Sequence, residues 1–397
     1  MLAVATWAWL ATAGVQAWQP PRTELNFVPF IGGDSDVGIG TGGAGDLSGL
    51  GAGGHPYRWR LEAAGMITFK SKPGGGIEIP FQDYYLTLVI PDLPPNGRMR
   101  LELRPSFTDE STQRFYGIGN ASPLPPAGFS REDTRYERTH AHAAAAVRFP
   151  VLSPGFFLRP QVELSYSSVD MRATSILAQE RINGTATVRN LLDGPLQFAS
   201  LAFETRLEYD GRDNELVTRS GVYNAIRLRY VPPLLDSFYH YAQLNLTLRA
   251  YRSLGPVTFS GRLIGDALVG NPPFYELTRI DESSVMGGGK GLRGVPGQRY
   301  YGKIKAFTNL EVRTELFRFH ISGKPFLVSP AVFADGGRVW ADWQYHPELD
   351  GTGLGLKYGL GGGIRVQQGT TFVVRAEVAW SPDAEPVGAY FNAGQLF

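Results

Sequence analysis

The sequence predicts an all-β protein: a sixteen-stranded antiparallel transmembrane β-barrel with a long inward-folding loop after the eleventh strand. Three observations favour this fold: composition, two-residue alternation of apolar and polar side chains, and the lengths of the connections. The chain has 49 glycines in 397 residues and 12% aromatic residues, and only 19% are charged, against about 25% in typical soluble proteins. There are no cysteines, which excludes disulfides, thiolate metal sites and a cysteine nucleophile.

The first seventeen residues form the only long apolar run. The run is shorter than the roughly 20 residues of a comfortable membrane-spanning helix, and it ends in Gly14-Val15-Gln16-Ala17, a small-x-small cleavage pattern. We therefore expect a signal peptide at 1–17, although no Lys or Arg precedes the run, and a transmembrane barrel domain at 18–397. The alternative is a membrane anchor. Because no other apolar helix is expected, a membrane protein with this sequence would have to cross the bilayer with strands.

The alternation is clearest between Lys303 and Leu316. Even positions from Ile304 carry apolar or small side chains, whereas odd positions from Lys303 carry five charged ones. Successive strand residues point to opposite faces, so this pattern predicts a strand with one apolar and one charged face. Such a strand suits a barrel wall between lipid and water.

Sixteen strands are expected along the chain, at 24–33, 36–46, 57–70, 77–90, 98–107, 134–149, 156–168, 198–209, 217–230, 242–253, 256–269, 303–317, 325–335, 353–367, 370–381 and 387–397. Long loops follow the fifth, seventh and eleventh strands, at 108–133, 169–197 and 270–302, whereas the connections after most even-numbered strands are short. Outer-membrane barrels alternate long outer loops with short periplasmic turns. A soluble β-sandwich is the alternative, but it gives no reason for this alternation.

The two terminal strands suggest an assembly signal and a weak seam. Phe391 and Phe397 share one face of the last strand, and the terminal Phe resembles the C-terminal signal of bacterial outer-membrane barrels. Pro29 in the first strand cannot donate a ladder hydrogen bond, and Gly388 and Gly394 in the last strand pair weakly. We expect these two strands to close the barrel with its least stable ladder, as a lateral gate would need.

Three motifs occur in order within the last third of the chain: Arg293-Gly294, then Asn309-x-Glu311-x-Arg313, then Phe333-x-Asp335-x-Gly337. Together they resemble the BamA/TamA superfamily of bacterial surface antigens, outer-membrane barrels that insert or translocate other proteins. The resemblance implies an Arg-Gly tip on the loop after the eleventh strand and a role in protein or lipid insertion or export. It also implies the bacterial outer membrane as location, with the lipid bilayer and the outer-membrane assembly machinery as partners.

The sequence departs from the family pattern in two places. Val295 stands where the family has an aromatic residue after Arg-Gly. Between Ala17 and Leu25 there is also no room for the periplasmic POTRA domains that usually precede the barrel, so we expect a POTRA-less barrel. A periplasmic partner would then supply the client-binding domains.

Strand parity predicts a partner for Arg293 independently of the resemblance. Asp335 lies on the opposite face from Val332 and Ala334, which suit the lipid, so Asp335 should point into the lumen. The loop that carries Arg293 is glycine-rich and long enough to fold inward, and guanidinium and carboxylate groups pair bidentately. Glu311 is the competing partner. The alternative is that Arg293 is an ordinary solvated loop charge.

No pattern in the sequence predicts an enzyme, a metal site or a cofactor. His140 and His142 lie two apart on one strand face, which could serve a metal or a Ser–His site but more often marks a polar wall. No nucleophile elbow appears, and net charge +1 favours no nucleic-acid partner. Three function classes stay open: an insertase or translocase, a loop-gated transport pore or partner-bound structural barrel, and a lipid-directed barrel enzyme.

Overall fold

In the computed structural model, the structure describes residues 22–34, 38–50, 57–72, 75–93, 99–123, 125, 127–214, 217–235, 238–279, 291–295, 298–321, 324–368, 372–383 and 387–393. The expected signal peptide, Gly394 and Phe397 lie outside these residues. None of the helices within the described ranges is long and apolar enough to span a membrane.

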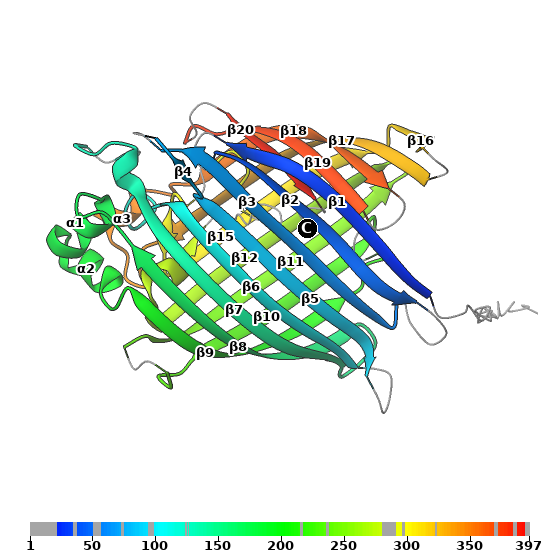
Figure 1. Ribbon diagram of the computed structural model, residues 1–397, viewed down its shortest axis with the longest axis horizontal. Coiled ribbons are helices and arrows are strands. Elements are labelled where there is room, and N and C mark those ends of the chain that lie inside the picture. The colour runs from blue at the N-terminus through cyan, green and yellow to red at the C-terminus, as the bar shows by residue number, and fades with distance from the viewer. Residues whose placement is uncertain are drawn as a thin grey trace, which may run out of the picture.

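One antiparallel sheet of eighteen strands forms the molecule, and its strands follow chain order (Figure 1). Two of the eighteen, β4 (Ile77–Glu78) and β16 (Phe317–Ile321), are short additions, which leaves the sixteen wall strands that the alternation predicted. The wall strands are β1 (Arg22–Asp34), β2 (Gly38–Leu50), β3 (Trp59–Ser71), β5 (Phe81–Leu93), β6 (Met99–Arg114), β7 (Arg135–Pro150), β8 (Phe156–Asp170), β9 (Gln197–Asp210), β10 (Gly221–Val231), β11 (His240–Leu254), β12 (Val257–Asn271), β15 (Ile304–Thr314), β17 (Lys324–Trp340), β18 (Lys357–Gln368), β19 (Phe372–Trp380) and β20 (Gly388–Ala393). A separate two-stranded ribbon pairs β13 (Thr278–Arg279) with β14 (Tyr301–Gly302).

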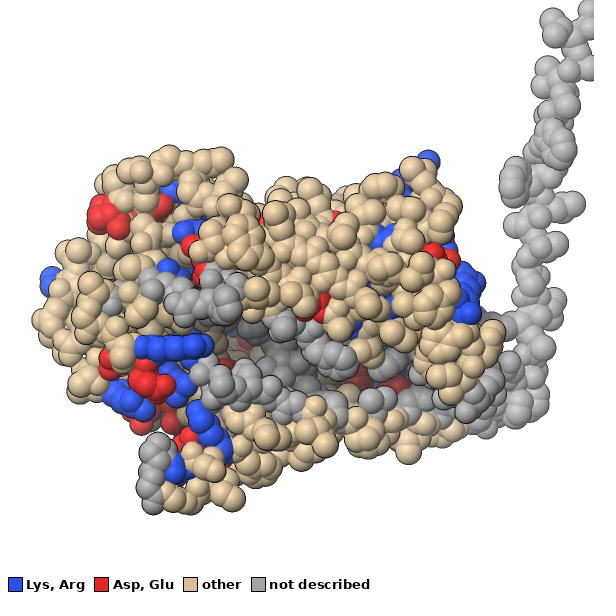
Figure 2. Space-filling model, turned by 90° about the horizontal axis from the view of Figure 1, so that it is seen from above, with Lys and Arg blue, Asp and Glu red and all other residues tan. Residues whose placement is uncertain are grey.

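The wall is apolar outside and polar inside, the reverse of a soluble protein. In β15, Leu310 is 55% exposed, whereas its neighbours Asn309 and Glu311 are buried. In β11, Leu246 is exposed and Thr247 is buried. Figure 2 shows that charged side chains gather mainly toward the two ends of the molecule and that the outer wall between them is mostly uncharged. An outward apolar face with a polar interior is typical of a barrel wall in lipid.

The connections also differ between the two ends of the sheet. The loops at 115–134, 171–196, 272–303 and 341–356 all lie at one end, whereas the other end has short connections such as 151–155 and 255–256. In outer-membrane barrels, connections as short as these are the periplasmic turns. The structure therefore matches the predicted alternation and adds a fourth long loop, after β17.

The long loops pack together into a cap, which we define as the segments 115–134, 171–196, 272–279 and 341–356. The cap contains the short helices α1 (Ile176–Asn183), α2 (Ala186–Leu192) and α3 (Pro347–Asp350) and the 3-10 turns η1 (Glu132–Thr134) and η2 (Phe274–Glu276), and the three helices gather at one end in Figure 1. Its apolar side chains join those at the strand ends in one buried core, which includes Phe115, Leu177, Leu192 and Phe274. The packed cap covers the loop ends of β7 to β12.

The expected closure between the first and last strands is not found. Within the described part of the chain, β1 pairs only with β2 and β20 pairs only with β19, so the sheet is not closed. Pro29, opposite Gly43 in the β1–β2 register, lacks the N–H that a ladder on either side would use. The described part of β20 has six residues against thirteen in β1, which limits the ladder these two strands could share.

Candidate functional site

Arg293 is buried against polar side chains of β15, β17 and β19. Its Nε and Nη2 donate hydrogen bonds of 2.8 Å to the two carboxylate oxygens of Asp335, and its backbone N–H donates a third, of 2.9 Å. Its Nη1 is 2.9 Å from Glu311 Oε2 and 3.0 Å from Glu377 Oε1. The guanidinium also stacks on the ring of Phe333, with Cζ 3.4 Å from the centroid.

Further arginines surround the same carboxylates. Arg365 Nη2 is 2.5 Å from Glu311 and 3.0 Å from Glu377, and Arg375 Nη1 is 2.9 Å from Glu377. We call Arg293, Glu311, Asp335, Arg365, Arg375 and Glu377 the Arg293 cluster. All six are buried. Buried charges are costly unless each is paired and hydrogen-bonded, so a network in which every carboxylate meets at least one guanidinium fixes its members in one arrangement.

Side-chain hydrogen bonds and close contacts at two glycines hold the loop tip beside the Arg293 cluster. Asn309 Nδ2 donates a 3.0 Å hydrogen bond to the carbonyl of Gly291, and Arg262 donates to Asn309 Oδ1. Gly294 has a φ of +94°, which favours glycine, and lets the chain turn beside Trp380. A Cβ on Gly359 would lie 1.9 Å from the carbonyl oxygen of Arg293, so only glycine allows the tip to approach β18 this closely.

Val295, which replaces the expected aromatic residue, is buried in a small apolar cluster. Its neighbours there are Leu292, Tyr300, Phe307 and others from β12 and β17. The side chain therefore packs the loop against the wall through apolar contact instead of ring stacking. Residues 280–290 and 296–297 of the same loop lie outside the described residues.

The other residues of the three sequence motifs lie around the Arg293 cluster. Arg313 lies 3.7 Å from Glu311 and donates through Nη2 to the carbonyl of Thr218, in the connection between β9 and β10. Phe333 is the ring beneath Arg293. A Cβ on Gly337 would lie 2.4 Å from Phe307 Cβ, so this glycine allows β15 and β17 to pack closely.

The predicted seam and assembly residues are not brought together with this cluster. Pro29 lies in the middle of β1, and Gly388 begins β20 opposite Ala379. Phe391 is opposite Ala376 in the β19–β20 ladder. The roles of these residues stay predictions.

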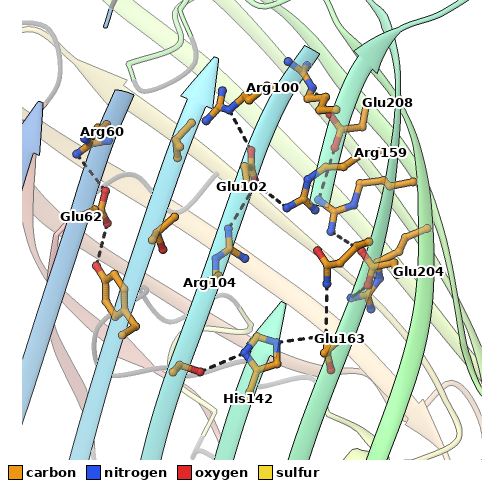
Figure 3. Close-up of a pocket in the computed structure, with 18 of the residues that line it drawn as sticks. Arg60, Glu62, Arg100, Glu102, Arg104, His142, Arg159, Glu163, Glu204 and Glu208 are labelled. Carbon is orange, nitrogen blue, oxygen red and sulfur yellow. Dashed lines mark hydrogen bonds and ion pairs between the residues drawn. The ribbon is translucent and has the colours of Figure 1, made fainter. Parts of the chain in front are cut away.

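A second site, a polar cavity of about 880 Å³, occupies the other half of the lumen, among strands β3 to β11 (Figure 3). His142 lies in its wall, with Nδ1 3.2 Å from Ser106 Oγ and Nε2 3.3 Å from Glu163 Oε2. Ser106 and His142 are direct cross-strand partners, and Glu163 also binds Arg229 at 2.7 Å. His140 contacts Ser167, at 2.8 Å. These contacts fit the polar wall interpretation of both histidines. No cluster of His, Asp or Glu that could hold a metal ion occurs among the residues the structure describes.

A model of the Omp85 superfamily domain matches residues 97–397, well over half of the chain. This protein belongs to the Omp85 superfamily. The match covers the loop tip, the strand motifs and the whole Arg293 cluster, so it confirms the resemblance that the three motifs predicted. A search among curated proteins finds no match.

Two solved structures show the same fold as this Omp85 barrel. The crystal structure of BamA from Haemophilus ducreyi lacking POTRA domains 1–3 aligns with a TM-score of 0.59 and 13% identity, over 95% of this chain and 70% of that one. CdiB from Acinetobacter baumannii aligns with a TM-score of 0.51 and 10% identity, over 94% of this chain and 59% of that one.

Sequence reasoning missed half of the Arg293 cluster in this Omp85 barrel. Arg365, Arg375 and Glu377 come from β18 and β19, far along the chain from the loop tip. Their signal was present, because Arg375 and Glu377 alternate with apolar residues and so belong to the luminal face. Alternation assigns a face but not a depth along the barrel, so it could not show that they meet Arg293.

Proposed function

We propose that this Omp85 barrel acts in the bacterial outer membrane, where it inserts other proteins or exports them across the bilayer. The Arg293 cluster carries the proposal: an Arg-Gly loop tip, within the segment that matches the Omp85 superfamily domain, is bound to three carboxylates from three strands. The resemblance to barrels that insert or translocate proteins supports the same conclusion.

In this proposal the loop tip fixes the shape of the C-terminal half of the barrel. Asp335, Glu311 and Glu377 come from β17, β15 and β19, so one guanidinium ties three strands at a common height. That half leads directly to β20 and the predicted seam. The cluster holds β15, β17 and β19 together, and the seam beside them is weakly paired. The seam can therefore open while the pairings between these strands stay intact.

The seam is the proposed place of client contact. A strand edge in lipid leaves N–H and C=O groups without partners, which costs several kcal/mol per group, so β1 or β20 gains stability by pairing with another strand. A client segment could add to such an edge by backbone hydrogen bonds. The outer-membrane assembly machinery and a periplasmic protein with client-binding domains are the proposed partners.

A loop-gated transport pore is the second candidate. It is favoured by the cavity of about 880 Å³ in the N-terminal half of the lumen. The cap, however, covers the loop end of the barrel above it, so conduction would require the cap to move.

Reconstitution of the purified protein in liposomes separates the two candidates. An insertase should raise the folding rate of an added client barrel, and a disulfide between cysteines placed in 28–33 and 388–393 should abolish that gain until it is reduced. The matched control is a disulfide between the paired strands β2 and β3, which should leave the gain unchanged. Single-channel current without any effect on client folding would show a pore instead.

A further inference from the structure

The cavity in the N-terminal half of the lumen lies apart from the Arg293 cluster. Its walls come from β3 to β11, and it reaches the short-connection end, because Arg212 of the 211–220 connection lines it. At the opposite end, the cap covers the loop ends of β7 to β12. A solute would therefore enter from the side that we assign to the periplasm.

Arginine dominates the lining of this cavity. Nine guanidinium groups face seven carboxylates, a surplus of two positive charges. Figure 3 shows Glu102 between Arg100, Arg104 and Arg159, which come from β6 and β8. Arg159 Nη2 is 2.6 Å from Glu102 Oε2, whereas Arg104 Nη2 is 3.8 Å from the same oxygen. Glu102 thus pairs closely with Arg159 and only weakly with Arg104.

Two arginines of the lining carry the surplus. The contact of Arg104 with Glu102 is its only ion pair within the described residues, and its side chain is 47% exposed to the cavity. Arg104 also lies within electrostatic range of Arg159 and Arg206, which repel it, and of Glu62, which attracts it. Arg249 forms no ion pair with any described residue; its guanidinium lies 5.1 Å from the ring centroid of Tyr223, and its buried Nε lacks a hydrogen-bond acceptor.

We propose that this cavity binds a phosphate monoester or pyrophosphate group that enters from the short-connection end. A surplus of two positive charges matches a phosphate monoester, whose charge is between −1.5 and −2 near neutral pH. Planar guanidinium groups bind phosphate oxygens through paired N–H donors. A volume of about 880 Å³ is also within the range of small-molecule sites, so it admits a phosphorylated headgroup or a free anion.

A single carboxylate fits the cavity less well than phosphate. Glu102, Glu204 and Glu208 already form close ion pairs with arginines of the lining. A ligand with one carboxylate would add a single negative charge and leave one of the two surplus positive charges unbalanced. The inference does not depend on protein insertion or export, because it concerns the half of the lumen without the Arg293 cluster.

Calorimetric titration of the purified full chain in zwitterionic detergent tests the site. The probes are inorganic phosphate, pyrophosphate, dihexanoyl phosphatidic acid and, as a neutral-headgroup comparison, dihexanoyl phosphatidylcholine. We expect saturable binding of at least one phosphate monoester or pyrophosphate probe. Arg104→Gln and Arg249→Gln should each weaken it about tenfold, since each removes a charge-assisted contact.

Arg252→Gln is the matched control, because Arg252 lies on the same strand as Arg249 but is on the exposed face. It should change the affinity by less than about twofold. Binding of phosphatidic acid alone identifies a lipid headgroup as the source, and equal binding of free phosphate identifies a soluble anion; both support the site. The proposal is overturned if no phosphate probe binds more strongly than chloride or if the Arg104 and Arg249 variants bind like wild type. It is also overturned if an octaglutamate peptide binds more tightly than pyrophosphate. A heat-shifted band on semi-native gels checks that each variant is folded.

Discussion

Arg293 donates two parallel hydrogen bonds to Asp335, and Asp335 has no other cationic partner among the described residues. The reverse does not hold, because Arg293 also binds Glu311 and Glu377. Asp335 therefore depends on Arg293 for the neutralisation of its charge, whereas Arg293 has two other carboxylate partners.

This asymmetry predicts unequal mutant effects. Arg293→Ala leaves Asp335 as an unpaired buried carboxylate, and breaking such a pair costs on the order of 3–5 kcal/mol. Asp335→Ala should cost less, because two carboxylates still neutralise Arg293. The double mutant should cost less than the two single mutants summed, since contacting residues are coupled. Thermal unfolding on semi-native gels measures all three.

Arg318→Ala is a suitable control for this cycle, because its pair with Glu315 is exposed, with 68% of the arginine side chain accessible. It should cost about 0–1 kcal/mol. Equal effects of the two single mutants at the cluster, or strictly additive effects, would contradict the arrangement described for Asp335. Protease digestion of the folded variants would show separately whether the loop leaves the lumen.

The close approach of Gly359 to Arg293 gives a second prediction. Gly359→Ala puts a Cβ 1.9 Å from the Arg293 carbonyl oxygen, so β18 or the loop tip must shift. We expect a loss of about 1–3 kcal/mol, typical of overpacking. Gly336→Ala, on the adjacent strand, meets its nearest atom at 3.9 Å and should be tolerated. If both variants melt like wild type, the loop tip does not rest on β18.

Glu180 makes the cap sensitive to pH. Burial raises the pKa of this α1 carboxyl from its ordinary 4.5 to about 7, and its Oε2 has no hydrogen-bond partner among the described residues. Below about pH 4.5 the group is protonated whether the cap is packed or open, so it carries no penalty. As pH rises toward 7, the open state ionises first, so the cap loses stability, by about 1–3 kcal/mol at most.

Hydrogen exchange of residues 171–196 between pH 5 and 8 measures this effect, after correction for the intrinsic rates. Protection should fall as pH rises in the wild type, and Glu180→Gln should remove that dependence and protect the segment above pH 7. Glu132→Gln, in the same cap but more exposed, serves as the control. An unchanged pH profile in the Glu180 variant would remove Glu180 as its cause.

The terminal residue gives a prediction about assembly. If Phe397 is part of an assembly signal, its deletion should lower the amount of heat-modifiable barrel in the outer membrane several-fold. Phe397→Tyr keeps an aromatic ring at the same position and should assemble almost normally. Equal folded yields for the deletion and the wild type would exclude this role for Phe397.

Much of the wall could be predicted from the sequence, because lipid outside and water inside impose a two-residue period on every strand. The inward direction of Asp335 followed from that period alone. The strand ends were less accurate: β6 continues to Arg114 and β17 to Trp340, beyond the expected 107 and 335. These extensions lie at the loop end, where β17 carries Val339 into an apolar cluster on the luminal side and the alternation fails.

The cap and the closure could not be predicted in the same way. Helices α1 and α2 have eight and seven residues, too short to form without tertiary contacts, and their burial depends on partners from distant loops. Closure was expected because most barrels leave no edge, but strand alternation contains no information about which edges meet. Whether two edge strands such as β1 and β20 pair depends on backbone geometry that side-chain patterns do not record.

The shared core of the cap has a consequence for passage through the loop end of the barrel. Because helices, turns and strand ends bury their apolar side chains against one another, moving one segment exposes the others, and the cap should open as a cooperative unit. A partly open cap would expose apolar surface to water without forming any new contact in compensation. Permeability of the loop end should therefore show a threshold: brief, complete openings separated by long closed periods, with a frequency set by the stability of the cap.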